Sequence, residues 1–303
     1  MASLAVASAE AAEVPGKKYI EEGNTMKKEI TITVANPAGN KTIYVHDAFD
    51  RADYARVAEQ LLAMEDIAAE QVAYILPVSE CGRAEGKMEM CGLEFCGNAT
   101  RTFGLMCAKK MGISGEGKVF IDTSGSDEIL TIEVNTDTNY TRVKMPKYVA
   151  IKHIDLTGVI ESEAGADIAN VKAVDFGGIL HLFLPNITAS AENFDKIKEF
   201  IYKGQNPPAV GVMFFDTESG KLTPVVYVKS VNSTYFEGSC ASGTTACATA
   251  LASEMPDGTH KFEFPQPGGT IQASAIVASG KVKDVYIEGP VEIDEPRVVT
   301  VEL

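Results

Sequence analysis

Two short cysteine motifs in this sequence have the residue types and the spacing of one site built from two similar parts. The first motif, FCGNATR, contains Cys96, and the second, SCASGTT, contains Cys240. Each cysteine is followed by small residues, by a threonine four positions later and by a methionine fifteen positions later. Two cysteines in such similar surroundings indicate one site at a junction, with a thiol on each face.

The chemistry of these motifs follows from their place at the start of predicted helices. Small residues at a helix start let a ligand approach free backbone N–H groups, which favour anions. A cysteine at that position is expected to have a lowered pKa and thiolate character. The motifs therefore predict an anion-binding site with two reactive thiols.

Composition limits the classes of protein that fit. A chain of 303 residues can hold two domains with full cores. The net charge of −15 argues against nucleic-acid binding, which needs a basic surface. No apolar run approaches the ~20 residues of a membrane span. The six cysteines include no C-x-x-C pair, so we expect no metal site, reduced thiols and a cytoplasmic location.

The order of predicted elements repeats once along the chain. Each half contains strands, an amphipathic helix, further strands, a cysteine helix and more strands. The cysteine helices are predicted at about 97–110 and 242–254, and the centre of the first, TFGLMCA, is apolar on nearly every side. Such a helix is expected to be enclosed by sheet. Short strands joined by hairpin-type turns predict antiparallel sheets and an α+β protein.

The repeat also suggests domain boundaries. Residues 1–25 have the Ala-rich composition of a flexible extension or tag, which leaves Met26 as a candidate start. We expect an N-terminal catalytic domain at 26–148 and a C-terminal catalytic domain at 149–291. The last strand, within 292–303, is a candidate to join the N-terminal domain.

The chain resembles the diaminopimelate epimerase family and, more loosely, the proline racemases. Cys96-Gly97-Asn98-Ala99-Thr100-Arg101 and Cys240-Ala241-Ser242-Gly243 occupy the places of the two cysteine motifs of that family. Ala38-Gly39-Asn40 resembles its N-terminal Gly-Asn turn. The resemblance implies two pseudo-symmetric domains, each an antiparallel barrel-like sheet around a central helix with a catalytic cysteine at its start.

The resemblance also implies a reaction. A cofactor-independent racemase removes the Cα proton on one face with a thiolate and returns a proton on the other face from a thiol. Cys96 and Cys240 would be these two groups, and no cofactor is expected. Helix N–H groups would hold the substrate carboxylate and stabilise the carbanion. The expected substrate-binding residues are Asn40, Gly97, Asn98, Ala241, Ser242 and Gly243.

Departures from the family pattern bear on the substrate. Diaminopimelate epimerases carry a Glu-Arg pair where this chain has Val231 and Asn232, and Ala209 stands where an asparagine is usual. These changes favour a histidine racemase, with diaminopimelate epimerase as the alternative. Proteins of other classes, a thiol redox switch or a non-catalytic binding protein on the same fold, stay open. The expected partner is a small amino acid, with a homodimer as one option for assembly.

Two further polar residues, Glu237 and His181, are predicted to have no catalytic role. Glu237 lies three positions before Cys240 and is predicted to be a solvated loop residue. His181 lies in an apolar strand and is predicted to be a core histidine with its hydrogen bonds satisfied.

Overall fold

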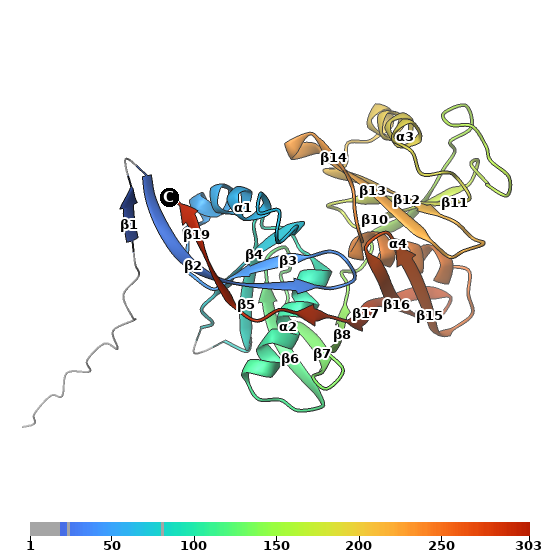
Figure 1. The fold of residues 1–303 in the computed structure, drawn as a ribbon. Helices are drawn as coiled ribbons and strands as arrows, with labels where there is room; N and C mark the ends of the chain where they lie inside the picture. The colour runs from blue at the N-terminus through green and yellow to red at the C-terminus, as the bar shows by residue number, and fades with distance from the viewer. Residues whose placement is uncertain (1–18, 23–24, 80–81) are drawn as a thin grey trace, which may run out of the picture.

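The computed structural model describes residues 19–22, 25–79 and 82–303, which form two lobes of strands and helices. The predicted α+β class is confirmed. Figure 1 shows the first lobe in blue and green and the second mainly in yellow and orange, with the last strand returning to the first. None of the helices in the described ranges is long and apolar enough to cross a bilayer.

The first lobe contains eight described strands and two α-helices. The strands are β1 (Tyr19–Glu22), β2 (Thr25–Asn36), β3 (Thr42–Val45), β4 (Gln71–Leu76), β5 (Gly86–Met90), β6 (Glu116–Thr123), β7 (Leu130–Asn135) and β8 (Tyr140–Lys144). The helices are the 3₁₀ turn η1 (Arg51–Asp53), α1 (Tyr54–Leu62) and the cysteine helix α2 (Gly97–Lys110).

The second lobe repeats this order of elements. Its strands are β9 (Ala150–Ile154), β10 (Val171–Asp175), β11 (Leu180–Pro185), β12 (Ala209–Phe215), β13 (Leu222–Val228), β14 (Ser233–Phe236), β15 (Gly258–Gln266), β16 (Gly269–Ala278) and β17 (Lys281–Pro290). Its helices are α3 (Ala191–Gly204), the 3₁₀ turn η2 (Lys229–Val231) and the cysteine helix α4 (Ala241–Ala252). The chain ends in β18 (Glu292–Ile293) and β19 (Arg297–Glu302), and both pair with β2.

The strands form two sheets that are not wholly antiparallel. The larger sheet runs β1-β2-β3-β4-β5-β6-β7-β8-β17-β16-β15, and the smaller runs β14-β13-β12-β11-β10-β9. Three neighbouring pairs are parallel: β3 with β4, β5 with β6, and β11 with β12. In the first and last of these pairs an amphipathic helix, α1 or α3, connects the two strands, as a parallel pair requires. The prediction of purely antiparallel sheets is therefore wrong at these places.

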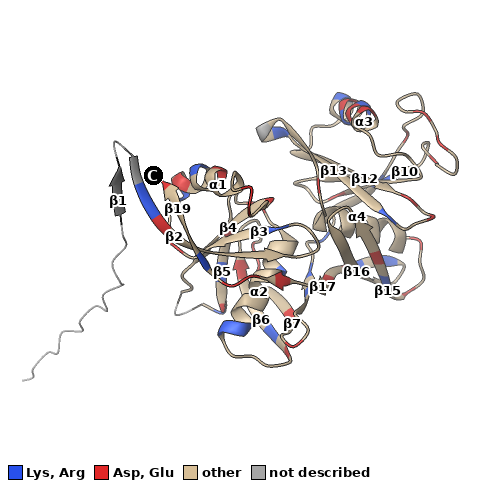
Figure 2. Ribbon diagram, viewed as in Figure 1, with Lys and Arg blue, Asp and Glu red and all other residues tan. Residues whose placement is uncertain are grey.

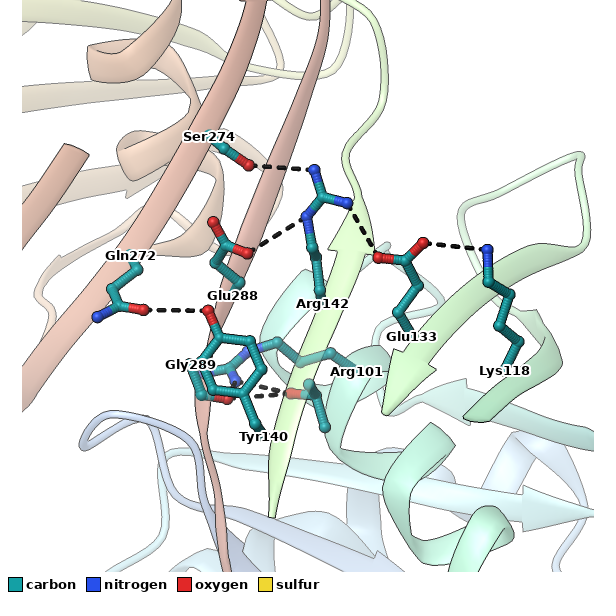
Figure 3. A network of polar contacts seen from close by, with 10 residues as sticks. Arg101, Lys118, Glu133, Tyr140, Arg142, Gln272, Ser274, Glu288 and Gly289 are labelled. Atoms are coloured by element: carbon teal, nitrogen blue, oxygen red, sulfur yellow. Dashed lines mark hydrogen bonds and ion pairs between the residues drawn. The ribbon is translucent and has the colours of Figure 1, made fainter. Parts of the chain in front are cut away.

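The lobes are joined where β8 pairs with β17, so the larger sheet continues from one lobe into the other. Figure 3 shows Arg142 of β8 reaching Glu133 (2.9 Å), Glu288 (3.3 Å) and the Ser274 hydroxyl (3.2 Å). The fully buried Arg101 of α2 donates to the carbonyl oxygen of Gly289 on β17 at 2.8 Å. Charged side chains thus fix the register between the lobes.

Both cysteine helices are enclosed, as predicted. Helix α2 packs on β5 to β8, and α4 lies between β10–β12 and β15–β17. A Cβ added to Gly104 of α2 would lie 2.7 Å from Ile132, which explains the glycine there. Helix α4 contains no charged residue and appears wholly tan in Figure 2, whereas α1 and α3 carry charges of both signs. An uncharged, fully packed helix places its N-terminus rigidly.

Candidate active site

The two cysteines occupy the same place in two helices with nearly the same backbone conformation. Cys96 is the N-cap of α2 with φ −124° and ψ 110°, and Cys240 is the N-cap of α4 with φ −126° and ψ 110°. Each sulfur accepts from the N–H three residues later, at 3.4 Å from Ala99 and 3.3 Å from Gly243. The threonine four positions after each cysteine donates to the cysteine carbonyl at 2.7 Å. The repeated motif is therefore a repeated capping structure.

The starts of the two helices meet between the lobes. Ala241, the first residue of α4, belongs to the same apolar cluster as Ala99 of α2, and Cys96 packs against that cluster. Close by, a Cβ on Gly39, which has φ +87°, would overlap the backbone of Gly268 in the β15–β16 turn. Backbone segments from both lobes thus approach each other directly beside the cysteines.

Cys96 has amide groups around its sulfur. Its thiol lies 3.1 Å from Oε1 of Gln71 and 4.0 Å from Oδ1 of Asn40. Asn40 donates to Glu70 at 2.7 Å and accepts from Asn98 at 3.4 Å. Asn40 and Asn98, predicted from sequence, are therefore connected to each other next to Cys96. Gln71 was missed, since a glutamine at the start of a strand has no distinguishing sequence signal.

The side chain of Asn98 points into the protein. It is fully buried, and its Oδ1 accepts from Nε of Arg101 at 3.3 Å. Burial lowers the pKa of Arg101 to about 10. In any α-helix the first N–H groups have no intrahelical acceptor, so the backbone at Gly97 and Asn98 offers donors while the Asn98 amide does not.

Cys240 lies between donors and an acceptor. Its Sγ is 3.5 Å from Oγ of Ser242, and the Glu237 carboxylate is close enough for its charge to act on the thiol. Its backbone N–H donates to Gln266 Oε1 at 2.9 Å. Ala241 is 7% exposed and its backbone, like that of Ser242, stands at the helix start. The structure therefore places the predicted second group of site residues around one sulfur.

The expectation of low thiol pKa values is wrong. Burial raises the pKa of Cys96 to about 11, against the lowering effect of the Ala99 N–H. Burial, and then the negative charge of Glu237, raise the pKa of Cys240 well above its usual value. The helix N–H groups act in the predicted direction, but removal of the thiolate from water costs more. At neutral pH the free protein keeps both thiols mainly protonated.

Glu237 is not the solvated loop residue that the sequence suggested. Burial raises its pKa to about 7, and its Oε2 has no hydrogen-bond partner among the described residues. The Cys240 hydrogen bond acts against this rise, while the charge of Glu70 adds to it. A buried carboxyl that titrates near neutrality beside a thiol is a candidate acid–base group. Only its nearness to Cys240 in sequence pointed to it.

His181 is buried as predicted, but only one of its two ring nitrogens has a hydrogen-bond partner among the described residues. Its Nε2 lies 2.9 Å from Oγ of Ser242, whereas Nδ1 has no partner in the described part of the chain. Burial lowers its pKa to about 3, so the ring is neutral. Among the described residues, no three His, Cys, Asp or Glu side chains gather as a metal site requires.

The arrangement of strands and helices matches several solved structures. A hydroxyproline epimerase from Agrobacterium vitis with bound trans-4-hydroxy-L-proline superposes with a TM-score of 0.60 and 12% identity, over 90% of this chain and 93% of that one. A phenazine biosynthesis protein of the PhzF family from Enterococcus faecalis gives a TM-score of 0.58 and 13% identity, over 89% and 99%. At these identities the likeness establishes the fold alone.

Sequence similarity identifies the family. A histidine racemase from Fusobacterium nucleatum subsp. nucleatum is 33% identical over 269 residues, 85% of this chain and 92% of the relative. A histidine racemase from Staphylococcus aureus is 26% identical over 81% of this chain and 88% of the relative. The family model described as the histidine racemase CntK N-terminal domain matches residues 29–295. The chain belongs to the histidine racemase family and is an isomerase, an amino-acid racemase.

Proposed function

We propose that this protein racemises histidine without a pyridoxal cofactor, with Cys96 and Cys240 as the two acid–base groups. The observation that carries the proposal is the matched capping of two helices whose N-termini meet, each with a sulfur at the same position. The names of the similar racemases support the amino acid. The fold would then be of the diaminopimelate epimerase type, with domains 26–148 and 149–291 and with 292–303 in the first.

The proton balance needs one thiolate and one thiol on opposite faces of Cα. The thiolate takes the Cα proton, and the other thiol gives its proton to the opposite face, so the two sulfurs exchange roles in each turnover. Backbone N–H groups at Gly97, Asn98 and Ser242 bind the carboxylate and stabilise the negative charge of the carbanion, while the Gly243 N–H donates to Sγ of Cys240. Asn40 and Ala241 complete the wall around the substrate.

Glu237 provides a route to the reactive state. The Glu237 carboxylate, whose charge acts on the Cys240 thiol, accepts the thiol proton and leaves a thiolate. Its pKa of about 7 lies near the working pH, where a base is most effective. Because burial raises both thiol pKa values, a proton acceptor next to Cys240 favours formation of the thiolate at neutral pH.

The proposed preference for histidine rests on the lack of side chains that could pair with a second zwitterionic end of the substrate. A second zwitterionic end, as in diaminopimelate, needs partners for two buried charges, since an unpaired buried charge costs several kcal/mol. Ala209 offers no polar side-chain group, and the amide of Asn232 already accepts from the Tyr227 hydroxyl at 2.9 Å. A substrate with one zwitterionic end and a neutral ring fits better. We place this reaction in the cytoplasm.

Substitution of each cysteine tests the mechanism. Cys96→Ala and Cys240→Ala should each abolish racemisation of L- and D-histidine, while Cys91→Ala, outside the site, serves as the matched control. Each single variant should still catalyse elimination from a substrate with a β-leaving group, because elimination needs one base. If Cys240→Ala racemises at near the normal rate, the two-thiol mechanism is wrong.

Substrate preference is tested separately. The kcat/KM for L-histidine should exceed that for LL-diaminopimelate, measured as deuterium uptake at Cα in D₂O. A preference for diaminopimelate would reject the specificity argument and leave the two-cysteine mechanism intact. Absence of exchange with any amino acid would favour a redox switch or a binding protein.

A further inference from the structure

A buried histidine is connected to the second cysteine through one hydroxyl. His181 of β11 is fully buried, and its Nε2 lies 2.9 Å from Oγ of Ser242. The same oxygen lies 3.5 Å from Sγ of Cys240. The contacts therefore run from the smaller sheet, through the first turn of α4, to the sulfur. The reaction proposed above assigns no role to this histidine.

The surroundings of the ring determine where its proton lies. Burial lowers the pKa of His181 to about 3, so the ring carries a single N–H. Nδ1 faces the backbone of Gly211 on β12, where an added Cβ would overlap it, and it has no partner among the described residues. A buried N–H without an acceptor is rarer in proteins than a buried acceptor without a donor. The favoured tautomer therefore carries the proton on Nε2.

This tautomer directs the hydroxyl of Ser242. When Nε2–H donates to the oxygen of Ser242, the hydroxyl proton of Ser242 cannot point to the ring. The other hydrogen-bond partner of this hydroxyl in the described structure is Sγ of Cys240, so the proton points to the sulfur. The Gly243 N–H already donates to the same sulfur at 3.3 Å. Both donors favour the thiolate, and they oppose burial and the charge of Glu237, which favour the thiol.

We propose that His181 is a positioning residue that holds the Ser242 hydroxyl as a donor to Cys240 and so stabilises the Cys240 thiolate. The proposal rests on the catalytic role proposed for Cys240. The corresponding position in the first motif is Asn98, whose amide is occupied by Asn40 and Arg101. The hydroxyl donor is thus a feature of the second cysteine and makes the two thiols chemically unequal.

The tautomer can be observed directly in the unmodified protein. In ¹⁵N-labelled enzyme, the ring nitrogens of His181 should show a protonated Nε2 and an unprotonated Nδ1, unchanged from pH 6 to pH 9. A protonated Nδ1 would overturn the proposal, because Ser242 would then donate to the ring and have no proton for the sulfur. This measurement uses the wild-type protein without substrate, so it does not depend on whether a variant folds.

The effect on the thiol is measured by alkylation of Cys240 with iodoacetamide at pH 9, resolved by peptide mass spectrometry. Loss of one donor to a thiolate raises the thiol pKa by about one unit, which lowers the alkylation rate about threefold to tenfold. Ser242→Ala and His181→Phe should both show this loss, and the double variant should show no more than Ser242→Ala. His181→Gln, whose amide nitrogen takes the place of Nε2, should retain most of the rate.

The controls separate this role from packing and from the proposed reaction. His153→Gln, at an exposed histidine of β9, should alkylate at the wild-type rate. If His181→Phe lowers only the melting temperature and leaves Cys240 alkylation unchanged, or if His181→Gln behaves as His181→Phe, the proposal is refuted. Should His181→Phe not fold, Ser242→Ala and the NMR measurement still decide. If the wild-type protein does not racemise histidine, the proposed reaction is rejected. The NMR and alkylation results would still decide the role of His181.

Discussion

Replacement of Glu237 by glutamine should stabilise the protein at alkaline pH and slow the reaction. Burial raises the pKa of Glu237 from 4.5 to about 7, a shift of 2.5 units that corresponds to about 3 kcal/mol. Glutamine has nearly the same shape and no charge to remove from water. The variant therefore keeps the packing and avoids the cost of the buried carboxylate.

The sign of the effect depends on pH. Below about pH 4.5 the carboxyl is protonated in both the folded and the unfolded chain, and it adds no penalty. Between pH 4.5 and 7 the unfolded chain releases this proton while the folded protein keeps it, so the stability of the wild type falls as pH rises. Above pH 7 the full penalty is present. The advantage of Glu237→Gln should grow from under 1 kcal/mol near pH 5 to about 3 kcal/mol at pH 8.

Urea unfolding at pH 5 and pH 8 measures this difference, with Glu116→Gln at an exposed position of β6 as the control. Racemisation by Glu237→Gln at pH 8 should be about 100-fold slower, the usual loss when a general base is removed. An equal stability difference at both pH values, or a variant less stable than wild type at pH 8, would refute the buried-carboxylate argument.

Two further predictions concern the junction and the first thiol. Gly39→Ala should lower the free energy of unfolding in urea by about 2 kcal/mol or more and reduce activity, because its Cβ would overlap the Gly268 backbone at φ +87°. The control Gly280→Ala, at φ +66° with open space around it, should lower the free energy of unfolding by about 1 kcal/mol. Equal losses of stability in the two variants would contradict the clash. The alkylation rate of Cys96 should keep rising toward pH 11, since burial raises its pKa to about 11, and a plateau by pH 8 would show a low-pKa thiol instead.

The fold was predictable where the signals are local. Small residues followed by an all-apolar stretch predict an enclosed helix, and α2 and α4 begin within one residue of the expected positions. Ser190 caps α3 as a serine before an amphipathic stretch predicts. The parallel strand pairs were missed because periodicity gives strands but not their partners, which are fixed by the connecting helices.

The site was predictable only in part, because burial is a property of the assembled lobes. The cysteines and their helix starts follow from a repeated motif, but Gln71 and His181 reach them from strands distant in sequence. Glu237 is close to Cys240 in sequence, but nothing in the sequence indicates that its carboxyl loses contact with water. The pKa of each cysteine depends on how much water the assembled lobes exclude from its sulfur. The local sequence does not determine this degree of burial. Sequence reasoning found the helix N–H donors and overestimated their effect against desolvation.

The two cysteines share a backbone geometry but differ in their neighbours, and both facts suit a racemase. In the proposed mechanism, matched helix N-termini would present similar donors to the carboxylate of either enantiomer, as a reaction between mirror-image substrates requires. Identical surroundings would, however, give no preference for which of the two thiols is ionised. A proton acceptor and a hydroxyl donor at Cys240 alone break that equivalence. In the proposed mechanism, Glu237 takes one proton without a second base at Cys96, so the pair of sulfurs would enter the reactive state with a single negative charge.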